Sequence, residues 1–242
     1  MNLPDLKQLT ERGLINPVVA QLLNASVHSG MNLVISGRSG TGRTTLLRAL
    51  GRAVPAHNRI VTLEVAPQLN LAGPGRQVIE MTGPSATDLM PIALRHNVHR
   101  ILVDESGPDS AVPLLQAMAS GDAGSMCTLT ATNPRDALNQ LIDHCAAEIG
   151  NPEAATYLVG QAIDLIIQLE SHGRPGDERR FVSHISEAHP REDSITLQQV
   201  FAPVPGQPRA VFQNRPARIQ DLEHASFDHT WLTDATRTWG HR

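Results

Sequence analysis

The sequence predicts an α/β protein in which a mostly parallel sheet carries helices on both faces and a C-terminal antiparallel strand appendage extends it. Three observations support this fold class. Short apolar segments alternate with helical segments as far as residue 149. A glycine-rich turn joins the first of the apolar segments to a helix. After residue 151, strand-like segments separated by turns replace the alternation.

The first 30 residues are expected to form a short helical lead-in. One helix spans 4–12 and ends at Gly13, and a second begins at Asn16-Pro17, because asparagine caps free N–H groups and proline is tolerated at the first helical position. A buried strand follows at 32–36. Further strands are expected at 59–63, 77–81, 100–104 and 125–130, and further helices at 85–95, 109–119 and 134–149.

The C-terminal part is expected to be built differently. Strand-like segments lie at 162–170, 179–186 and 194–201, with Arg179 and Arg180 solvated at a hairpin edge. Repeated prolines after Ala202 predict an irregular tail with one short helix near 219–225. The expected divisions are therefore a lead-in (1–30), the main α/β domain (31–201) and a proline-rich tail (202–242).

Composition excludes several classes of function. The net charge is -4 and aromatic residues make up 3%, which argues against a nucleic-acid partner. No apolar run approaches the roughly 20 residues of a membrane span, so no membrane insertion is expected. The two cysteines, Cys127 and Cys145, cannot form a disulfide framework and indicate a reducing compartment. Lys7 is the sole lysine of the sequence; the other basic residues are all arginine.

A phosphate-binding loop is the strongest motif. Gly37, Gly42 and Thr44 fit the template G-x-x-x-x-G-K-[ST], whose glycines let backbone N–H groups and a helix N-terminus face phosphates. Arg43 stands where lysine is expected, and its planar fork should displace the γ-phosphate geometry. A dinucleotide fold would need glycine at Thr45, and an esterase elbow would need it at Thr41. The expected nucleotide-binding residues are Gly37, Arg38, Ser39, Gly40, Thr41, Gly42, Arg43, Thr44 and Thr45.

Two acids end an apolar strand about 60 residues after the loop. In proteins with such a loop, an aspartate here helps to hold Mg²⁺, and an adjacent glutamate polarises the attacking water. Asp104 is therefore expected to bind magnesium together with Thr44, and Glu105 to be catalytic. The alternative is an acid pair that only caps a turn.

Residues 3–201 resemble the C-terminal ATPase domain of type II/IV secretion and pilus-assembly motors, with the Tad/CpaF-type ATPases as the nearest branch. The resemblance implies a RecA-like core that binds ATP or ADP with Mg²⁺, and catalytic roles for Glu64 and Arg95. It also implies a homo- or hetero-oligomeric ring, hexameric in the family, that works in the cytoplasm against an inner-membrane platform protein. The matching segments are 32–47, 59–64, 88–89, 93–95, 100–103, 114–118, 124–126, 134–138, 161–166 and 195–198.

The departures from the family pattern gather on the expected site. Groups that stabilise phosphoryl charge act mainly in the transition state, so their loss reduces hydrolysis more than binding. One departure instead adds a functional group, because Asp104 stands where the family usually has glycine. The family's N-terminal domain is expected to be absent. The replaced positions are Arg43 for lysine, Val65 and Gln68 for acids, Thr130 for histidine, Pro91 and Asn97 for arginines, and Ser106-Gly107 at another arginine.

Three functions remain open at this level. The first is a secretion-type ATPase homologue that binds ATP or ADP but hydrolyses it weakly or not at all. The second is a regulatory or structural subunit of such a ring without nucleotide chemistry. The third is an active motor with a rewritten site, which Asp104 and Glu105 would favour.

Overall fold

The computed structural model describes residues 4–83, 86–96, 98–120, 124–174, 177–234 and 236–239. Within these residues, one sheet has the strand order β3-β2-β4-β5-β1-β6-β7-β8-β9. The strands from β3 to β6 are parallel and β7 to β9 are antiparallel, so the predicted fold class is confirmed. The strands are β1 Leu33–Gly37, β2 Arg59–Glu64, β3 Gln77–Thr82, β4 Arg100–Val103, β5 Met126–Thr130, β6 Leu165–His172, β7 Arg179–Pro190, β8 Ile195–Val204 and β9 Gln207–Phe212.

Three helices begin at an Asn-Pro pair. The side chains of Asn16, Asn133 and Asn151 each accept a backbone N–H of the first turn, and the proline that follows needs no acceptor of its own. The last of these helices, α7, corrects the sequence analysis, which expected no helix there and began a strand at residue 162. The helices are α1 Leu6–Glu11, α2 Pro17–His28, α3 Arg43–Ala53, α4 Ala86–Leu94, α5 Pro108–Ala119, α6 Pro134–Ile149, α7 Pro152–Ala162 and α8 Ile219–His224.

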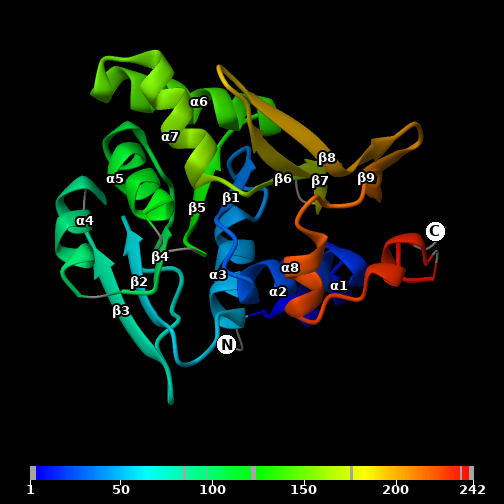
Figure 1. The fold of residues 1–242 in the computed structure, drawn as a ribbon. Helices are drawn as coiled ribbons and strands as arrows, with labels where there is room; N and C mark the ends of the chain where they lie inside the picture. The colour runs from blue at the N-terminus through cyan, green and yellow to red at the C-terminus, as the bar shows by residue number, and fades with distance from the viewer. Residues whose placement is uncertain are drawn as a thin grey trace.

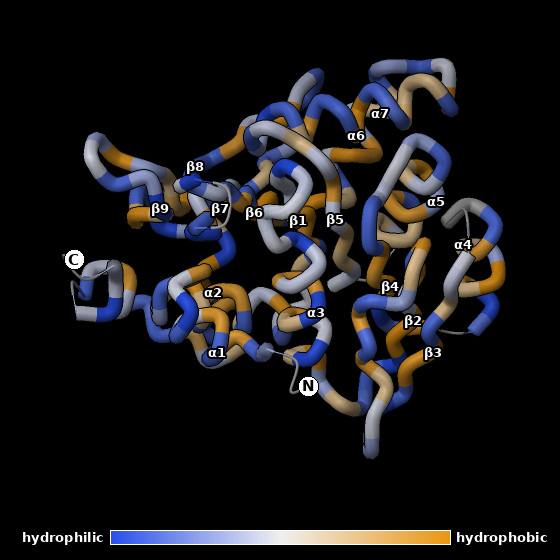
Figure 2. Tube along the Cα trace, turned by 180° about the vertical axis from the view of Figure 1, so that it is seen from behind, coloured by the Kyte–Doolittle hydropathy of each residue, from blue (hydrophilic) through white to orange (hydrophobic). Residues whose placement is uncertain are grey.

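The central strands are buried on both faces. Leu33 and Ile35 of β1 belong to one apolar core, formed largely with α1, α2, α3 and α8, while Val34 between them belongs to a second core under α4 to α7. Figure 1 shows these two groups of helices on opposite sides of the sheet. Hydrophobic residues run along α2, β2 and β4 in Figure 2. For β2 and β4, this is expected of strands that helices cover on both faces.

The C-terminal segment is more regular than predicted. The short helix near 219–225 is confirmed as α8, but β9 lies where irregular structure was expected, and it pairs with β8. The buried carboxylate of Glu187 accepts the N–H groups of Ala217 (2.7 Å) and Arg218 (3.2 Å). The indole of Trp239 donates to the Ala210 carbonyl at 2.9 Å. These contacts hold the segment against the sheet, which local proline content does not reveal.

The described helices fall short, in length or in apolar character, of what crossing a bilayer requires.

Both cysteine thiols are expected to resist modification in the native protein. Burial, with Glu105 adding to it, raises the pKa of Cys127 to about 12, and burial with Glu148 raises the pKa of Cys145 to about 11. A raised thiol pKa leaves little reactive thiolate at pH 8. Neither cysteine should react with a maleimide at pH 8 without denaturant, and both should react in urea, as mass spectrometry would show. Labelling of the native chain would contradict this.

Candidate functional site

The glycine-rich loop connects β1 to α3 at the carboxyl end of the sheet. At Gly37, a Cβ would lie 2.6 Å from Thr41 Oγ1 and 2.7 Å from the Leu169 carbonyl oxygen, so only glycine fits. Gly42 has φ of 102° and precedes the first turn of α3, whose N-terminus has no side-chain cap. The uncapped N–H groups of this helix and the left-handed turn before it form the arrangement that binds phosphate in P-loop proteins. Arg38, Ser39 and Gly40 are exposed at the tip of the loop.

Thr44 and Asp104 meet beside the loop. The Thr44 hydroxyl lies 3.1 Å from Asp104 Oδ1, and Thr128 donates to the same oxygen at 3.0 Å. Asp104 is buried at the end of β4, where these hydroxyl contacts fix the orientation of its carboxylate. Magnesium prefers oxygen ligands and is usually held by one or two protein groups together with phosphates. A hydroxyl and a carboxylate beside a phosphate loop fit this ion, which would neutralise phosphate charge when bound.

Arg43 and Glu105 form an ion pair across the mouth of the loop. The two terminal nitrogens of Arg43 lie 2.9 and 3.3 Å from the two Glu105 oxygens, and the Thr130 hydroxyl donates to Glu105 Oε1 at 2.7 Å. Glu105 itself has φ of 66°, and its N–H donates to Thr128 Oγ1 at 2.7 Å. Arg43 and Thr130, which the sequence analysis noted as departures from the expected lysine and histidine, therefore both bind the carboxylate that was predicted to polarise water.

Glu64 lies at the same edge of the sheet but is bound to its own loop. The side chain is 3% exposed, and Oε2 accepts the N–H groups of Gln68 (2.6 Å) and Leu69 (2.8 Å). The Thr62 hydroxyl donates to Oε1 at 3.1 Å. Glu64, Asp104 and Glu105 line a small cavity of about 140 Å³. The structure thus brings Glu64 near Asp104 and Glu105, and its carboxylate holds the backbone of the loop that follows β2.

Arg95 is not brought to this site. It is exposed just after α4, near the start of β4, whereas the phosphate loop follows the carboxyl end of β1. Because β4, β5 and β1 are parallel, the start of β4 lies at the amino ends of these strands, whereas the end of β1 lies at their carboxyl ends on the opposite side of the sheet. Asn97, noted as a departure from the family arginines, lies outside the described residues.

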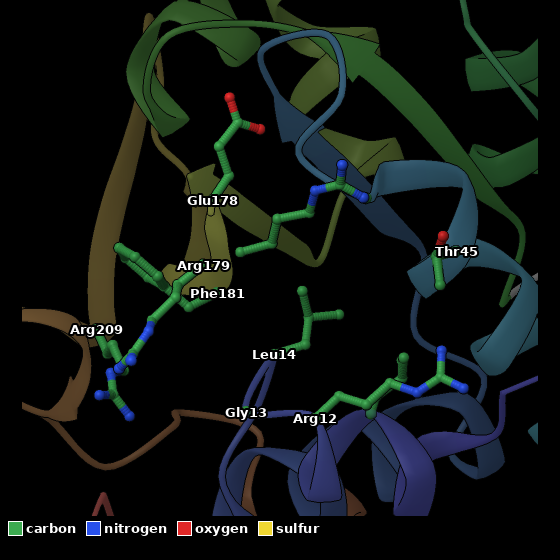
Figure 3. Close-up of a pocket in the computed structure, with 11 residues that line it drawn as sticks. Arg12, Gly13, Leu14, Thr45, Glu178, Arg179, Phe181 and Arg209 are labelled. Atoms are coloured by element: carbon green, nitrogen blue, oxygen red, sulfur yellow. The ribbon is translucent and has the colours of Figure 1, made fainter. Parts of the chain in front are cut away.

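A larger cavity of about 490 Å³ opens beside the loop, and the sequence analysis missed it. Gly42 and Thr45 form its wall on the loop side, and Thr45 faces it from α3 (Figure 3). Arg179 and Arg180, expected at a solvated hairpin edge, are exposed at the start of β7 and also line this cavity. No local sequence signal indicates this position, because it follows from β6 pairing with both β1 and β7.

Comparison with known proteins decides the family. The model of the type II/IV secretion system protein family matches residues 2–189. The chain belongs to this family. A curated relative in the secretion family, the type IV secretion system protein PtlH of Bordetella pertussis, is 33% identical over 174 residues, covering 66% of this chain and 51% of its own. The conjugal transfer protein TrbB of Rhizobium radiobacter is 30% identical over 172 residues, covering 69% and 52%. The chain thus spans about half the length of these relatives.

Solved structures of secretion proteins share the fold. The VirB11 ATPase of the Brucella suis type IV secretion system, in complex with sulphate, aligns with a TM-score of 0.64 and 23% identity, over 75% of this chain and 54% of that one. The pilus retraction motor PilT with bound ADP aligns with a TM-score of 0.54 and 16% identity, over 98% and 61%. The predicted resemblance to secretion and pilus-assembly ATPases is confirmed at this level, and the Tad/CpaF branch stays a prediction.

Proposed function

We propose that this chain binds ATP or ADP with Mg²⁺ at the loop of residues 37–45 and hydrolyses ATP weakly or not at all. The observation that carries the proposal is the contact of Thr44 with Asp104 beside an uncapped helix N-terminus. A hydroxyl, a carboxylate and inward-facing N–H groups are what a magnesium-bound polyphosphate requires. The bound ADP of PilT, named with that structure, is consistent with this.

Weak hydrolysis is supported by the contacts that the Glu105 carboxylate makes. A carboxylate polarises water best when a free oxygen can accept the proton of that water. Here Arg43 contacts both oxygens, and Thr130 donates to one of them. The guanidinium also neutralises the charge that would attract the proton. Nucleotide binding relies on the loop N–H groups, Thr44 and Asp104 and not on Glu105, so binding is expected to persist where turnover is lost.

We further propose the setting that the family implies. The chain would assemble into a homo- or hetero-oligomeric ring, with six subunits as the expected number, and act in the cytoplasm on the inner-membrane platform of a type II/IV secretion or Tad pilus machine. Arg95, exposed and remote from the loop of its own subunit, would have a catalytic role only on a neighbouring subunit in such a ring.

Titration calorimetry with ADP, in Mg²⁺ and in EDTA, tests this proposal. Mg²⁺ should tighten binding about tenfold in the wild type, and Asp104→Asn should abolish most of that gain, because outer contacts of a metal site change affinity by about 10–100-fold. The exposed Asp143 on α6 provides the matched control, since Asp143→Asn removes the same charge away from the loop. Absence of heat with millimolar Mg-ATP and Mg-ADP would sink the proposal and favour the regulatory subunit without nucleotide chemistry.

A further inference from the structure

The cavity beside the phosphate loop is lined by arginines from separate parts of the chain. Arg12 follows α1, Arg179 and Arg180 begin β7, and Arg209 lies on β9. Glu178 is the acidic residue in the lining. Figure 3 shows Arg12, Arg179 and Arg209 around the space next to Leu14 and Thr45. A cavity of about 490 Å³ lies within the range of roughly 300–1,000 Å³ that small-molecule sites occupy.

These four guanidinium groups outnumber Glu178, the acidic residue that lines the cavity with them. In the described part of the chain, none of the ion pairs involves these four arginines. Arg209 stacks over the ring of Trp239 at 4.7 Å, which orients it without cancelling its charge. Four like charges on one cavity repel each other, and this repulsion is relieved when an anion binds among them.

The nucleotide of the proposed function supplies too little charge for this cavity. Its 5′-phosphates belong on the loop, where Arg180 can assist, because Arg180 Cδ lies 3.9 Å from the Cβ position of Gly42. The part beyond Gly42 and Thr45 would be ribose and base, which are neutral, and the largely buried Leu9, Leu14 and Phe181 form the apolar part of the cavity wall. Arg12, Arg179 and Arg209 would then face no anionic group of the nucleotide, and Glu178 is a single negative charge among the four arginines of the lining.

We propose that this site selects a nucleotide that carries phosphate on the 2′ or 3′ oxygen of the ribose as well as on the 5′ oxygen. Arginine is suited to the extra group because its planar fork donates two parallel hydrogen bonds to phosphate oxygens. The inference rests on the proposed function, since it places the 5′-phosphates on the loop. It deepens that function by naming the class of nucleotide.

Calorimetry with three related probes tests the inference. Adenosine 2′,5′-bisphosphate or 3′,5′-bisphosphate should bind about tenfold or more tightly than adenosine 5′-monophosphate, the gain expected for one charge-assisted contact worth about 1.4 kcal/mol. In the double variant Arg12→Ser/Arg179→Ser, this ratio should fall below about threefold. Both residues are exposed, so their loss should leave the fold intact. The control Arg191→Ser, at an exposed turn outside the cavity, should keep the wild-type ratio.

The fluorescence of Trp239 gives a second readout. The sequence has two tryptophans, and Trp231→Phe leaves Trp239 as the single reporter beside Arg209. The bisphosphate that binds more tightly should change its emission, while the monophosphate should change it less. If ADP binds but neither bisphosphate gains over the monophosphate, the inference is overturned and the proposed function stands. If ADP does not bind either, both fall.

Discussion

Replacing Arg43 with lysine is expected to raise the steady-state rate of ATP hydrolysis by about tenfold or more, since a freed general base contributes about 10²–10⁴-fold. Arg43 contacts both Glu105 oxygens, at 2.9 and 3.3 Å. Lysine has one ammonium group and cannot occupy both oxygens in this forked manner. Its compact charge is also the one that suits the β- and γ-phosphates in P-loop proteins. The measurement is phosphate release at saturating Mg-ATP.

The double variant Arg43→Lys/Glu105→Gln isolates the cause of this gain. Glutamine keeps the shape of Glu105 but cannot polarise water, so the double variant should return to the wild-type rate. A rate for Arg43→Lys equal to wild type would contradict the prediction and place the defect at Thr130 or Val65. A wild-type rate well above that of Glu105→Gln would instead identify an active motor with a rewritten site.

Replacing Asn32 with alanine is expected to destabilise the fold by about 3 kcal/mol, because removing one partner leaves buried polar groups unsatisfied. The side chain is 5% exposed. Its amide donates to the carbonyls of Ala162 (2.8 Å) and Met118 (3.2 Å), and its oxygen accepts the N–H groups of Gly124 (2.8 Å) and Ser125 (3.0 Å). One side chain therefore joins α5, α7 and the approach to β5 at the start of β1.

Urea denaturation measures this loss as the change in the free energy of unfolding, and the melting temperature should fall by about 6–12 °C for a chain of this size. Asn214 provides the control, because its amide also donates to a carbonyl, that of Gln199, but on the surface. Asn214→Ala should change stability by no more than about 0.5 kcal/mol. A loss below about 1 kcal/mol for Asn32→Ala would show that water replaces these hydrogen bonds.

Local chemistry explains why much of the fold was predictable. The Asn-Pro pairs at residues 16 and 133 begin helices through contacts within one turn, and the apolar segments of β1, β2, β4 and β5 are largely buried, whereas the edge strand β3 is not. The same signal at Asn151-Pro152 marks α7, which the sequence analysis did not predict because strand-like segments follow directly. The error over β9 has another cause, because an edge strand tolerates proline and depends on its neighbour β8.

The sequence by itself determined the loop from Gly37 to Thr44 and the position of Asp104 and Glu105 at a strand end. Their conformations and positions depend on glycine geometry and on burial of a short strand, which are local properties. The tertiary structure alone decided that Arg43 and Thr130 bind Glu105, that Arg95 lies at the opposite end of the strands, and that arginines from the end of α1, from β7 and from β9 line one cavity. These outcomes depend on strand order and register, which bring together side chains that are far apart in the sequence. The residues around each of these side chains do not indicate which distant residue it will contact.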